Sequence, residues 1–168
     1  LLRAWAKDNA LDLPPAGKYG VAMCFLPRDT ASLDCAVNIL EKFIDKEGQR
    51  LIGWRDITVD TTGMGQTVLD EMPVIRQAII GMGESTAEQD AFERKLLSIR
   101  KQTQNPLAEK ADELNLPGLN EFYMPSCSTR TVVYKGLLLA GQVGCFYEGV
   151  RNSLPLSAFS LRHQRLST

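Results

Sequence analysis

The side chains with the most reactive chemistry in this chain are its four cysteines and its single histidine. Cys24, Cys35, Cys127 and Cys145 lie far apart in the sequence, and no two of them form a C-x-x-C pair. A chain of this length and apolar content needs no disulfide framework, so we expect four reduced thiols. A zinc site is not expected either, because there is no Cys/His cluster to bind the metal.

The C-terminal stretch FSLRHQRLST places a histidine and an arginine on one face of a predicted strand. With the two-residue period of a strand, Phe159, Leu161, His163 and Arg165 share that face. A histidine on an apolar strand face is more typical of a packed core residue than of a general base. By residue type alone, Arg165 is most simply interpreted as a solvated arginine near the chain end.

Hydroxyl side chains gather at Ser126, Ser128 and Thr129, next to a cysteine, and resemble a nucleophile cluster in composition only. No base lies beside them in the sequence, so we interpret them as turn residues. The two G-M-G triplets, at 63–65 and 81–83, do not extend to G-x-G-x-x-G. No dinucleotide-binding loop is therefore predicted.

Composition limits the classes of protein to which the chain can belong. Its 168 residues are 44% hydrophobic and 23% charged, values that suit one globular domain. A formal net charge of −1 gives no reason to expect nucleic acid or an anionic membrane as a partner. No apolar run approaches the roughly 20 residues that span a bilayer. The first residues lack the plan of a signal peptide and an initiator Met, so we expect a processed chain or a piece of a longer one.

Residues 18–103 alternate in the order β-α-β-β-α, which is typical of a split βαβ unit. The predicted elements are a strand at 18–27, a helix from about Asp29 or Thr30 to a cap at Gly48, strands at 50–60 and 72–82, and a helix ending near Thr103. Ser85 and Glu88 have the spacing of a capping box for the second helix. We expect one core to bury the residues Leu40, Phe43, Trp54, Ile75 and Phe92 together.

The second half of the chain is predicted to contain strands and no long helix. Residues 104–120 hold two prolines, a glycine and several asparagines, and are interpreted as a surface connection. Residues 121–168 are predicted to be core strands, and the run TRTVVYKG at 129–136 is strongly β-forming.

Two stretches carry a resemblance to a known family. SCSTRTVVYKGLLLAGQVGCFY (126–147) resembles the S-S-R-T-[IV]-V-Y-K-G-[ML]-L-L-A…F-Y segment of the large subunit of glutamate synthase. LRHQRLST (161–168) is similar to that family's L-V-H-S-R-F-S-T. The segments 13–29, 51–60 and 90–101 also resemble the family in order and spacing, so the resemblance covers essentially the whole chain.

The resemblance implies the α+β fold of a class-II glutamine amidotransferase domain, an N-terminal-nucleophile sandwich of two sheets between helical layers. Residues 1–168 would form a single, partial domain of this kind. Within it, the β-α-β-β-α unit at 18–103 would be a family-specific elaboration that shapes the glutaminase site or docks it against the synthase domain.

The family's chemistry requires an N-terminal cysteine, whose thiolate attacks the glutamine amide, and an Asn-Gly pair that forms the oxyanion hole. This sequence has neither part, since residue 1 is Leu and no Asn-Gly-Glu motif occurs in it. The catalytic role is therefore carried over to no residue. By itself, this chain is expected to hydrolyse no glutamine.

The resemblance assigns one substrate-binding residue. Arg165 matches the family arginine that holds the α-carboxylate of glutamine, and a guanidinium can meet a carboxylate with two parallel hydrogen bonds. Gln164 and Leu166 stand where the family has Ser and Phe. The strand would end on Arg165 because it leaves the core there and opens onto the substrate cleft.

The implied cofactors and partners belong to the complete enzyme. Ammonia from glutamine would travel to a (β/α)8 domain that carries FMN and an iron–sulfur cluster, and would there aminate 2-oxoglutarate to glutamate. Electrons would come from a flavoprotein small subunit that uses NAD(P)H, or from ferredoxin. This chain would hold no cofactor, would contact glutamine and the remainder of the large subunit, and would be cytoplasmic.

A second interpretation comes from another class of protein. The β-α-β-β-α order, closed by a strand at 130–135, also fits a free-standing ferredoxin-like module that binds a small ligand or a partner without catalysis. The missing nucleophile favours this alternative slightly, whereas the R-T-V-V-Y-K-G run favours the amidotransferase.

Overall fold

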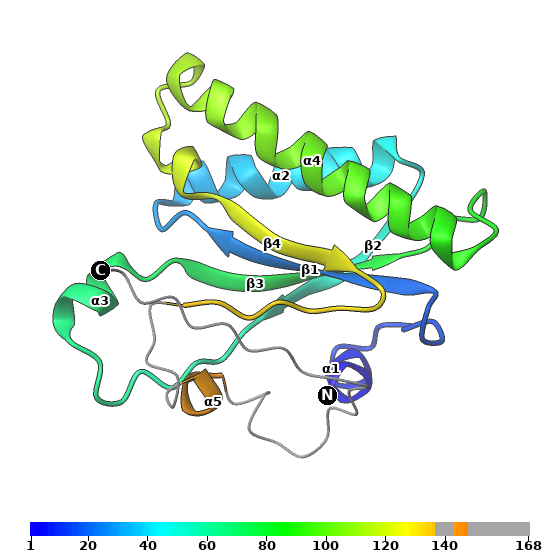
Figure 1. Cartoon of the computed structure of the whole chain (residues 1–168), viewed down its shortest axis with the longest axis horizontal. Helices are drawn as coiled ribbons and strands as arrows, with labels where there is room; N and C mark the ends of the chain where they lie inside the picture. Colours follow the sequence, from blue (N-terminus) through cyan, green and yellow to red (C-terminus); the bar gives the residue numbers. More distant parts are fainter. Residues whose placement is uncertain (137–142, 148–168) are drawn as a thin grey trace, which may run out of the picture.

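The computed structural model describes residues 1–136 and 143–147 of the chain (Figure 1). Its elements are α1 (Leu2–Asp8), β1 (Tyr19–Leu26), α2 (Thr30–Lys46), β2 (Arg50–Asp56), α3 (Gln66–Glu71), β3 (Val74–Gly81), α4 (Gln89–Glu113), the 3-10 helix η1 (Pro117–Glu121), β4 (Tyr123–Ser128) and α5 (Val143–Phe146). The short helices α1, α3 and α5 were not predicted, and α5 lies in the region 121–168 that was predicted to consist of core strands. None of the three has an apolar stripe long enough to be recognised as a helix by its period.

The four strands form one sheet in the order β2-β3-β1-β4, and every neighbouring pair is antiparallel. Helix α2 connects β1 to β2 across the intervening β3, and α4 connects β3 to β4 across β1. Each connection is a split βαβ unit, and together they give the ferredoxin-like arrangement of strands. The predicted β-α-β-β-α order and the α+β class are confirmed.

Helices α2 and α4 lie side by side over one face of the sheet (Figure 1). Ala22, Cys24 and Leu26 of β1 point to this face because alternate residues of a strand share a side. They pack in the main core with Leu40 of α2 and Phe92 of α4, and all five are fully buried.

The ends of α2 are as the sequence predicts. Asp29 caps the N-terminus, where its carboxylate accepts a hydrogen bond from the Ser32 amide at 2.8 Å. Gly48 follows the C-terminus with φ +69°, the left-handed conformation that favours glycine.

The opposite face of the sheet carries a second apolar cluster. Met23, Phe25 and Ile75 of the sheet pack there against Phe146 and Tyr147. Trp5 and Leu11, in and just after α1, lie against β2 on this side, within 3.3 Å of where a Cβ on Gly53 would stand.

The expectation of a single core is therefore wrong in part. Leu40 and Phe92 are in the main core and Trp54 packs against it, but Ile75 belongs to the second cluster. Phe43 is half-buried, and the ammonium of Lys46 lies 5.4 Å from the centre of its ring. The face of Ile75 follows from the pairing of β3 with its neighbours, which the hydrophobic run at 74–81 does not specify.

The predicted surface connection at 104–120 is wrong for its first part, because α4 continues to Glu113 through Pro106. A proline in a helix interior costs about 3 kcal/mol. Here Ile99, Thr103, Leu107 and Ala111, spaced by four, are all buried and extend the contact of the helix with the core. Only 114–122 connects α4 to β4, and it contains η1.

Two further predictions are corrected. The N-cap of α4 is Glu88 and its side chain makes no capping bond, so Ser85 forms no capping box with it. A turn closed by the Thr86 amide and the Gly83 carbonyl at 3.0 Å occupies that segment instead. The described strand of the second half is β4, and 129–136 is not a strand. The rest of the predicted core-strand region, 137–142 and 148–168, lies outside the described residues.

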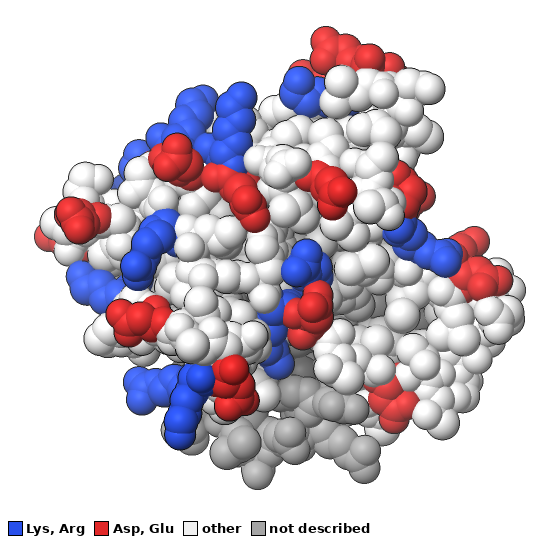
Figure 2. Space-filling model, turned by 180° about the vertical axis from the view of Figure 1, so that it is seen from behind, with Lys and Arg blue, Asp and Glu red and all other residues white. Residues whose placement is uncertain are grey.

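Charges are mixed over the surface seen in Figure 2, where acidic and basic side chains are interspersed. None of the helices within residues 1–136 and 143–147 is both long and apolar enough to cross a membrane.

The C-terminus of α2 is attached to α4 through Glu47. Its carboxylate accepts hydrogen bonds from Lys95 at 2.8 Å and Ser98 at 2.9 Å, and a third from Gln102. These bonds, that of Lys95 foremost, lower the pKa of Glu47 against the opposing effect of its burial. With its side chain 14% exposed, Glu47 is well placed to stabilise the helical layer.

We expect Glu47→Gln to lower the free energy of unfolding by about 1 kcal/mol at pH 7. The effect is small because solvent screens the ion pair with the exposed Lys95. A lowered folded pKa means that the contribution is fully present above the unfolded value of about 4.3 and is lost as the pH falls through the folded value. Urea denaturation at pH 7 and pH 3 should therefore show the difference shrinking in acid. Asp45→Asn, at an exposed position two residues before Glu47, is the control. An equal difference at both pH values would contradict the role of the carboxylate.

Candidate functional site

The predicted substrate residue, Arg165, lies outside the described residues, as does His163. Its assignment stays a prediction. The described part of the candidate site is the run 130–136, which carries the most specific part of the sequence resemblance, together with the residues that hold it.

This run leaves the end of β4, turns under the sheet and follows its second face toward α5 (Figure 1). The run has a strong β propensity but is not a strand, because its backbone amides bond to side chains and not to the backbone of a neighbouring strand. The amide of Val133 donates to the Ser126 hydroxyl at 3.0 Å. The amides of Arg130 and Thr131 donate to the Ser128 hydroxyl, at 3.0 and 3.3 Å.

The start of the run is fixed by Glu93 of α4. Its carboxylate accepts the Thr129 amide at 2.7 Å, the Thr129 hydroxyl at 2.5 Å and the Ser128 hydroxyl at 3.0 Å. Arg130 also pairs with Asp90 at 2.5 Å, but both side chains are more than half exposed, so this ion pair contributes little.

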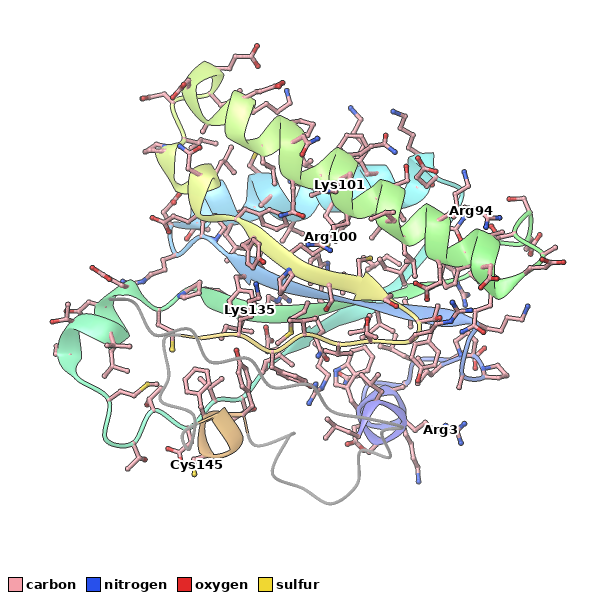
Figure 3. All side chains as sticks on the ribbon, viewed as in Figure 1. Arg3, Arg94, Arg100, Lys101, Lys135 and Cys145 are labelled. Atoms are coloured by element: carbon pink, nitrogen blue, oxygen red, sulfur yellow. The ribbon has the colours of Figure 1, made fainter. Side chains whose placement is uncertain are left out.

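The end of the run is fixed by contacts of Tyr134 and Lys135. Figure 3 labels Lys135. The Tyr147 hydroxyl donates to the Lys135 carbonyl at 2.5 Å, and the rings of Tyr134 and Tyr147 meet edge to face at 4.8 Å. Burial, and Tyr134 beside it, raise the pKa of Tyr147, so its hydroxyl remains a donor. The Lys135 ammonium donates to the Tyr123 hydroxyl at 2.7 Å.

The hydroxyl cluster at 126–129 is thus structural. Thr129 lies in the bend after β4, as predicted, whereas Ser126 and Ser128 lie within β4, so the turn prediction is wrong for these two. Each hydroxyl is engaged with the run or with Glu93, and histidine, the usual base for a nucleophilic hydroxyl, is absent from the described residues.

All four cysteines are free, as predicted. Burial raises the pKa of the Cys24 thiol to about 12 and raises that of Cys127 further, so both are protonated near neutral pH. The thiolate is the nucleophilic form, so neither buried cysteine is a candidate nucleophile. Cys145 is exposed in α5.

Two features were missed by the sequence predictions. Arg55 and Gln77, opposite each other on β2 and β3, are joined by a hydrogen bond of 2.9 Å on the second face. Burial lowers the pKa of Arg55, but a guanidinium stays protonated in proteins. Glu93 was the other omission. Its partners lie 35 and 36 residues away in the sequence, so no local pattern marks it.

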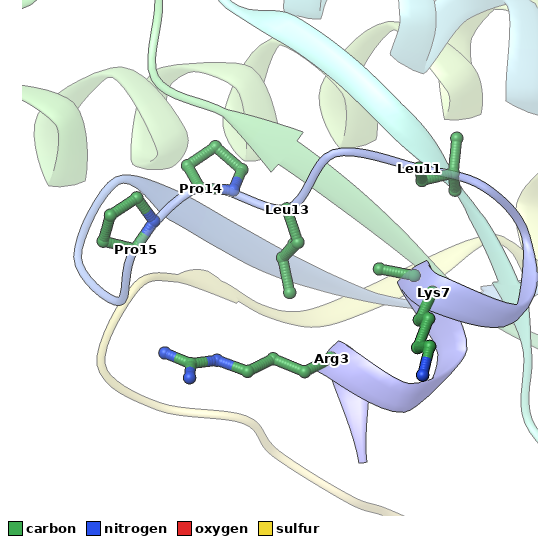
Figure 4. A pocket seen from close by; sticks show the side chains of 7 residues that line it. Arg3, Lys7, Leu11, Leu13, Pro14 and Pro15 are labelled. Atoms are coloured by element: carbon green, nitrogen blue, oxygen red, sulfur yellow. The ribbon is translucent and has the colours of Figure 1, made fainter.

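An open pocket of about 490 Å³ lies between α1 and the segment that follows it (Figure 4). The cationic side chains of Arg3 and Lys7 stand beside an apolar wall that includes Leu11, Leu13 and Pro14. Among residues 1–136 and 143–147, the side chains that line the pocket include no acid, hydroxyl or thiol.

The described residues form an α+β domain, in which the sheet and α4 hold the run 130–136 in place. The family described as "Glutamine amidotransferases class-II" matches residues 1–168, and the chain belongs to that family. The four-stranded antiparallel sheet and its helices are consistent with an N-terminal-nucleophile fold.

Relatives of this chain include glutamate synthases of several kinds. It is 35% identical over 159 residues to the NADPH glutamate synthase large chain of Bacillus subtilis, covering 94% of this chain and 10% of the relative. It is 34% identical over 164 residues to ferredoxin-dependent glutamate synthase 1 of Arabidopsis thaliana, and the match covers 98% of this chain and 10% of the relative. A third relative, the NADPH glutamate synthase large chain of Azospirillum brasilense, is 32% identical over 155 residues, and the match covers 92% of this chain and 10% of the relative.

The chain therefore spans about a tenth of the length of these relatives. The predicted resemblance to the glutamate synthase family is confirmed. The alternative of a free-standing binding module is not favoured, although the strand order is the one that it required.

Proposed function

We propose that this chain is part of the glutaminase domain of a glutamate synthase. In the complete protein, this domain releases ammonia from glutamine for the reductive amination of 2-oxoglutarate to glutamate. The observation that carries the proposal is similarity over 92–100% of the chain to glutamate synthases at 30–35% identity.

In this proposal the chain binds and positions the substrate, and the nucleophile comes from an N-terminal cysteine outside it. That thiolate attacks the amide carbon of glutamine, and ammonia leaves as the acyl-enzyme forms; water then releases glutamate. Arg165 holds the α-carboxylate. The buried thiols of Cys24 and Cys127 take no part, since both are protonated near neutral pH.

FMN and an iron–sulfur cluster are proposed for other parts of the complete protein. Such a cluster is held by several converging thiolates. Over residues 1–136 and 143–147, no three His, Cys, Asp or Glu side chains converge on a common point. These residues therefore do not fit an iron–sulfur cluster, and no step here is assigned to one.

The partners proposed are glutamine and the remainder of the large subunit. The electron donor is a flavoprotein subunit or ferredoxin, and relatives named for NADPH and for ferredoxin both support this pair of choices. We propose a cytoplasmic location, in line with the four free thiols.

The test of the proposal is a glutaminase assay on the complete polypeptide that contains this domain. We expect glutamine to be hydrolysed to glutamate, and we expect an alkylating reagent directed at the N-terminal cysteine to abolish the activity. Glutamine bound before alkylation should protect the enzyme. Activity that survives full alkylation would contradict the proposed chemistry.

A further inference from the structure

We propose that Arg55, on the face of the sheet opposite α2 and α4, binds the carboxylate group of a small organic acid. The proposed function gives this side chain no role, and the inference is independent of the assignment of Arg165. It rests on the burial of the Arg55 side chain, on the group that orients its guanidinium, and on the apolar residues beside it.

Arg55 is a half-buried cation without a counter-charge. Its guanidinium donates a hydrogen bond of 2.9 Å to the Gln77 carbonyl oxygen. Across the part of the chain that the structure describes, Arg55 forms no ion pair and no other hydrogen bond. A guanidinium has five N–H donors in a fixed fork, so most of them are left for a ligand. Because loss of water disfavours an unpaired charge, an anion would stabilise Arg55.

The partner of Arg55 is itself buried and fixed. Gln77 is 2% exposed and lies opposite Arg55 in the register of β2 and β3. Its amide nitrogen donates to the sulfur of Met23 at 3.7 Å, so its carbonyl oxygen is the group that faces the guanidinium. A neutral amide orients the fork of Arg55 but does not neutralise its charge.

The next pair along the same two strands shows how an arginine is neutralised in this sheet. Asp56 of β2 lies opposite Arg76 of β3, and the two side chains form an ion pair of 2.8 Å. The guanidinium of Arg76 also lies 5.1 Å from the ring centre of Trp54. A carboxylate therefore stands opposite Arg76, whereas an amide stands opposite Arg55.

The neighbours of Arg55 favour an organic acid over an inorganic anion. On the same face of β2, the ring of Trp5 comes within 3.3 Å of where a Cβ on Gly53 would stand. Two residues beyond Arg55, Ile57 packs in the second apolar cluster with Tyr134. A carboxylate matches the planar fork with two parallel hydrogen bonds, and the carbon atoms attached to it would be removed from water against these side chains.

The experiment is chemical modification of arginine in the complete protein. Phenylglyoxal reacts with guanidinium groups, and mass spectrometry of the digested protein gives the rate at each arginine. We expect benzoate at about ten times its Kd to slow the modification of Arg55 about tenfold, because only the free site reacts. Acetate, which lacks the apolar body, should protect only at higher concentration. Arg94, exposed on α4, is the control, and benzoate should not change its rate.

Two variants make the test specific to this site. Gln77→Glu places a carboxylate opposite Arg55 and should protect the guanidinium without any added acid. Asp56→Asn is the matched control, because it removes the partner of Arg76 on the other face. Benzoate should protect Arg55 equally in this variant and in the wild type.

Other results would overturn the inference. If Arg55 reacts at the same rate with and without each acid, no carboxylate binds there. If inorganic phosphate protects as well as benzoate at equal concentration, the site does not select an organic acid. If Arg55 reacts only in the unfolded protein, the rest of the polypeptide covers it and no free ligand reaches it. None of these measurements uses glutaminase activity, so a failure of the proposed function is a separate result.

Discussion

Replacing Arg165 by alanine in the complete protein should lower kcat/KM for glutamine by a factor of about 30 to 4,000. The substrate carboxylate would enter a partly desolvated cleft without its partner, and breaking a hydrogen-bonded charge pair costs about 2–5 kcal/mol. At about 1.4 kcal/mol per decade this gives the stated range. Arg165→Lys should recover only part of the loss, because it keeps the charge and loses the planar fork.

The control for the Arg165 variants is glutamate synthesis with free ammonia in place of glutamine as the nitrogen donor. Synthesis from free ammonia bypasses the glutamine site, so the ammonia-dependent activity of the same preparation should survive the substitution. Arg162→Ala provides a matched loss of charge from the other face of the predicted strand. A variant of Arg165 that loses both activities in proportion would show that the arginine is structural.

The second large effect is expected at Gly83, in the turn after β3. A Cβ at this position would stand 1.8 Å from the backbone carbonyl oxygen of Gly48, which no rotamer change can relieve. Gly48 is itself held in a left-handed conformation at the end of α2, with φ +69°. Gly83→Ala must therefore move the backbone of one of the two turns, with loss of the bond from the Gly83 amide to Gln49 at 2.9 Å.

We expect Gly83→Ala to lower the free energy of unfolding by about 3 kcal/mol, the upper part of the usual range for overpacking. Amides in β1 and β3 that exchange by global unfolding should then exchange about a hundredfold faster. Gly65→Ala is the matched control, since a Cβ there meets nothing within 4 Å and φ is −70°. Equal exchange in the two variants would mean that the 48–83 contact relaxes without cost.

Much of the fold was predictable because its signals are local. The strands and helices of the 18–103 unit follow from hydrophobic periods of two and of 3.6 residues, and Asp29 and Gly48 mark the ends of α2 by their own conformational preferences. The four free cysteines and the family were also accessible from the sequence. The assignment of Arg165 rests on the sequence resemblance alone.

Other features depend on contacts between distant segments. Pro106 and the polar residues around it favour a break, yet α4 continues because Leu107 and Ala111 find the core beneath them. Residues 129–136 have the composition of a strand, but Glu93 and Ser126 take the amides and hydroxyls that would otherwise begin a ladder.

The sequence by itself therefore determined the order of helices and strands in the 18–103 unit, and the family to which the chain belongs, because these properties follow from neighbouring residues. Tertiary structure decided which face of the sheet Ile75 occupies, where α4 ends and which carboxylate holds the R-T-V-V-Y-K-G run. Each of these is set by a partner 30 or more residues away or by strand register. A hydrogen bond between Glu93 and Thr129 has no local signature, since either residue alone is an ordinary polar side chain and only the crossing of α4 over β4 brings them together.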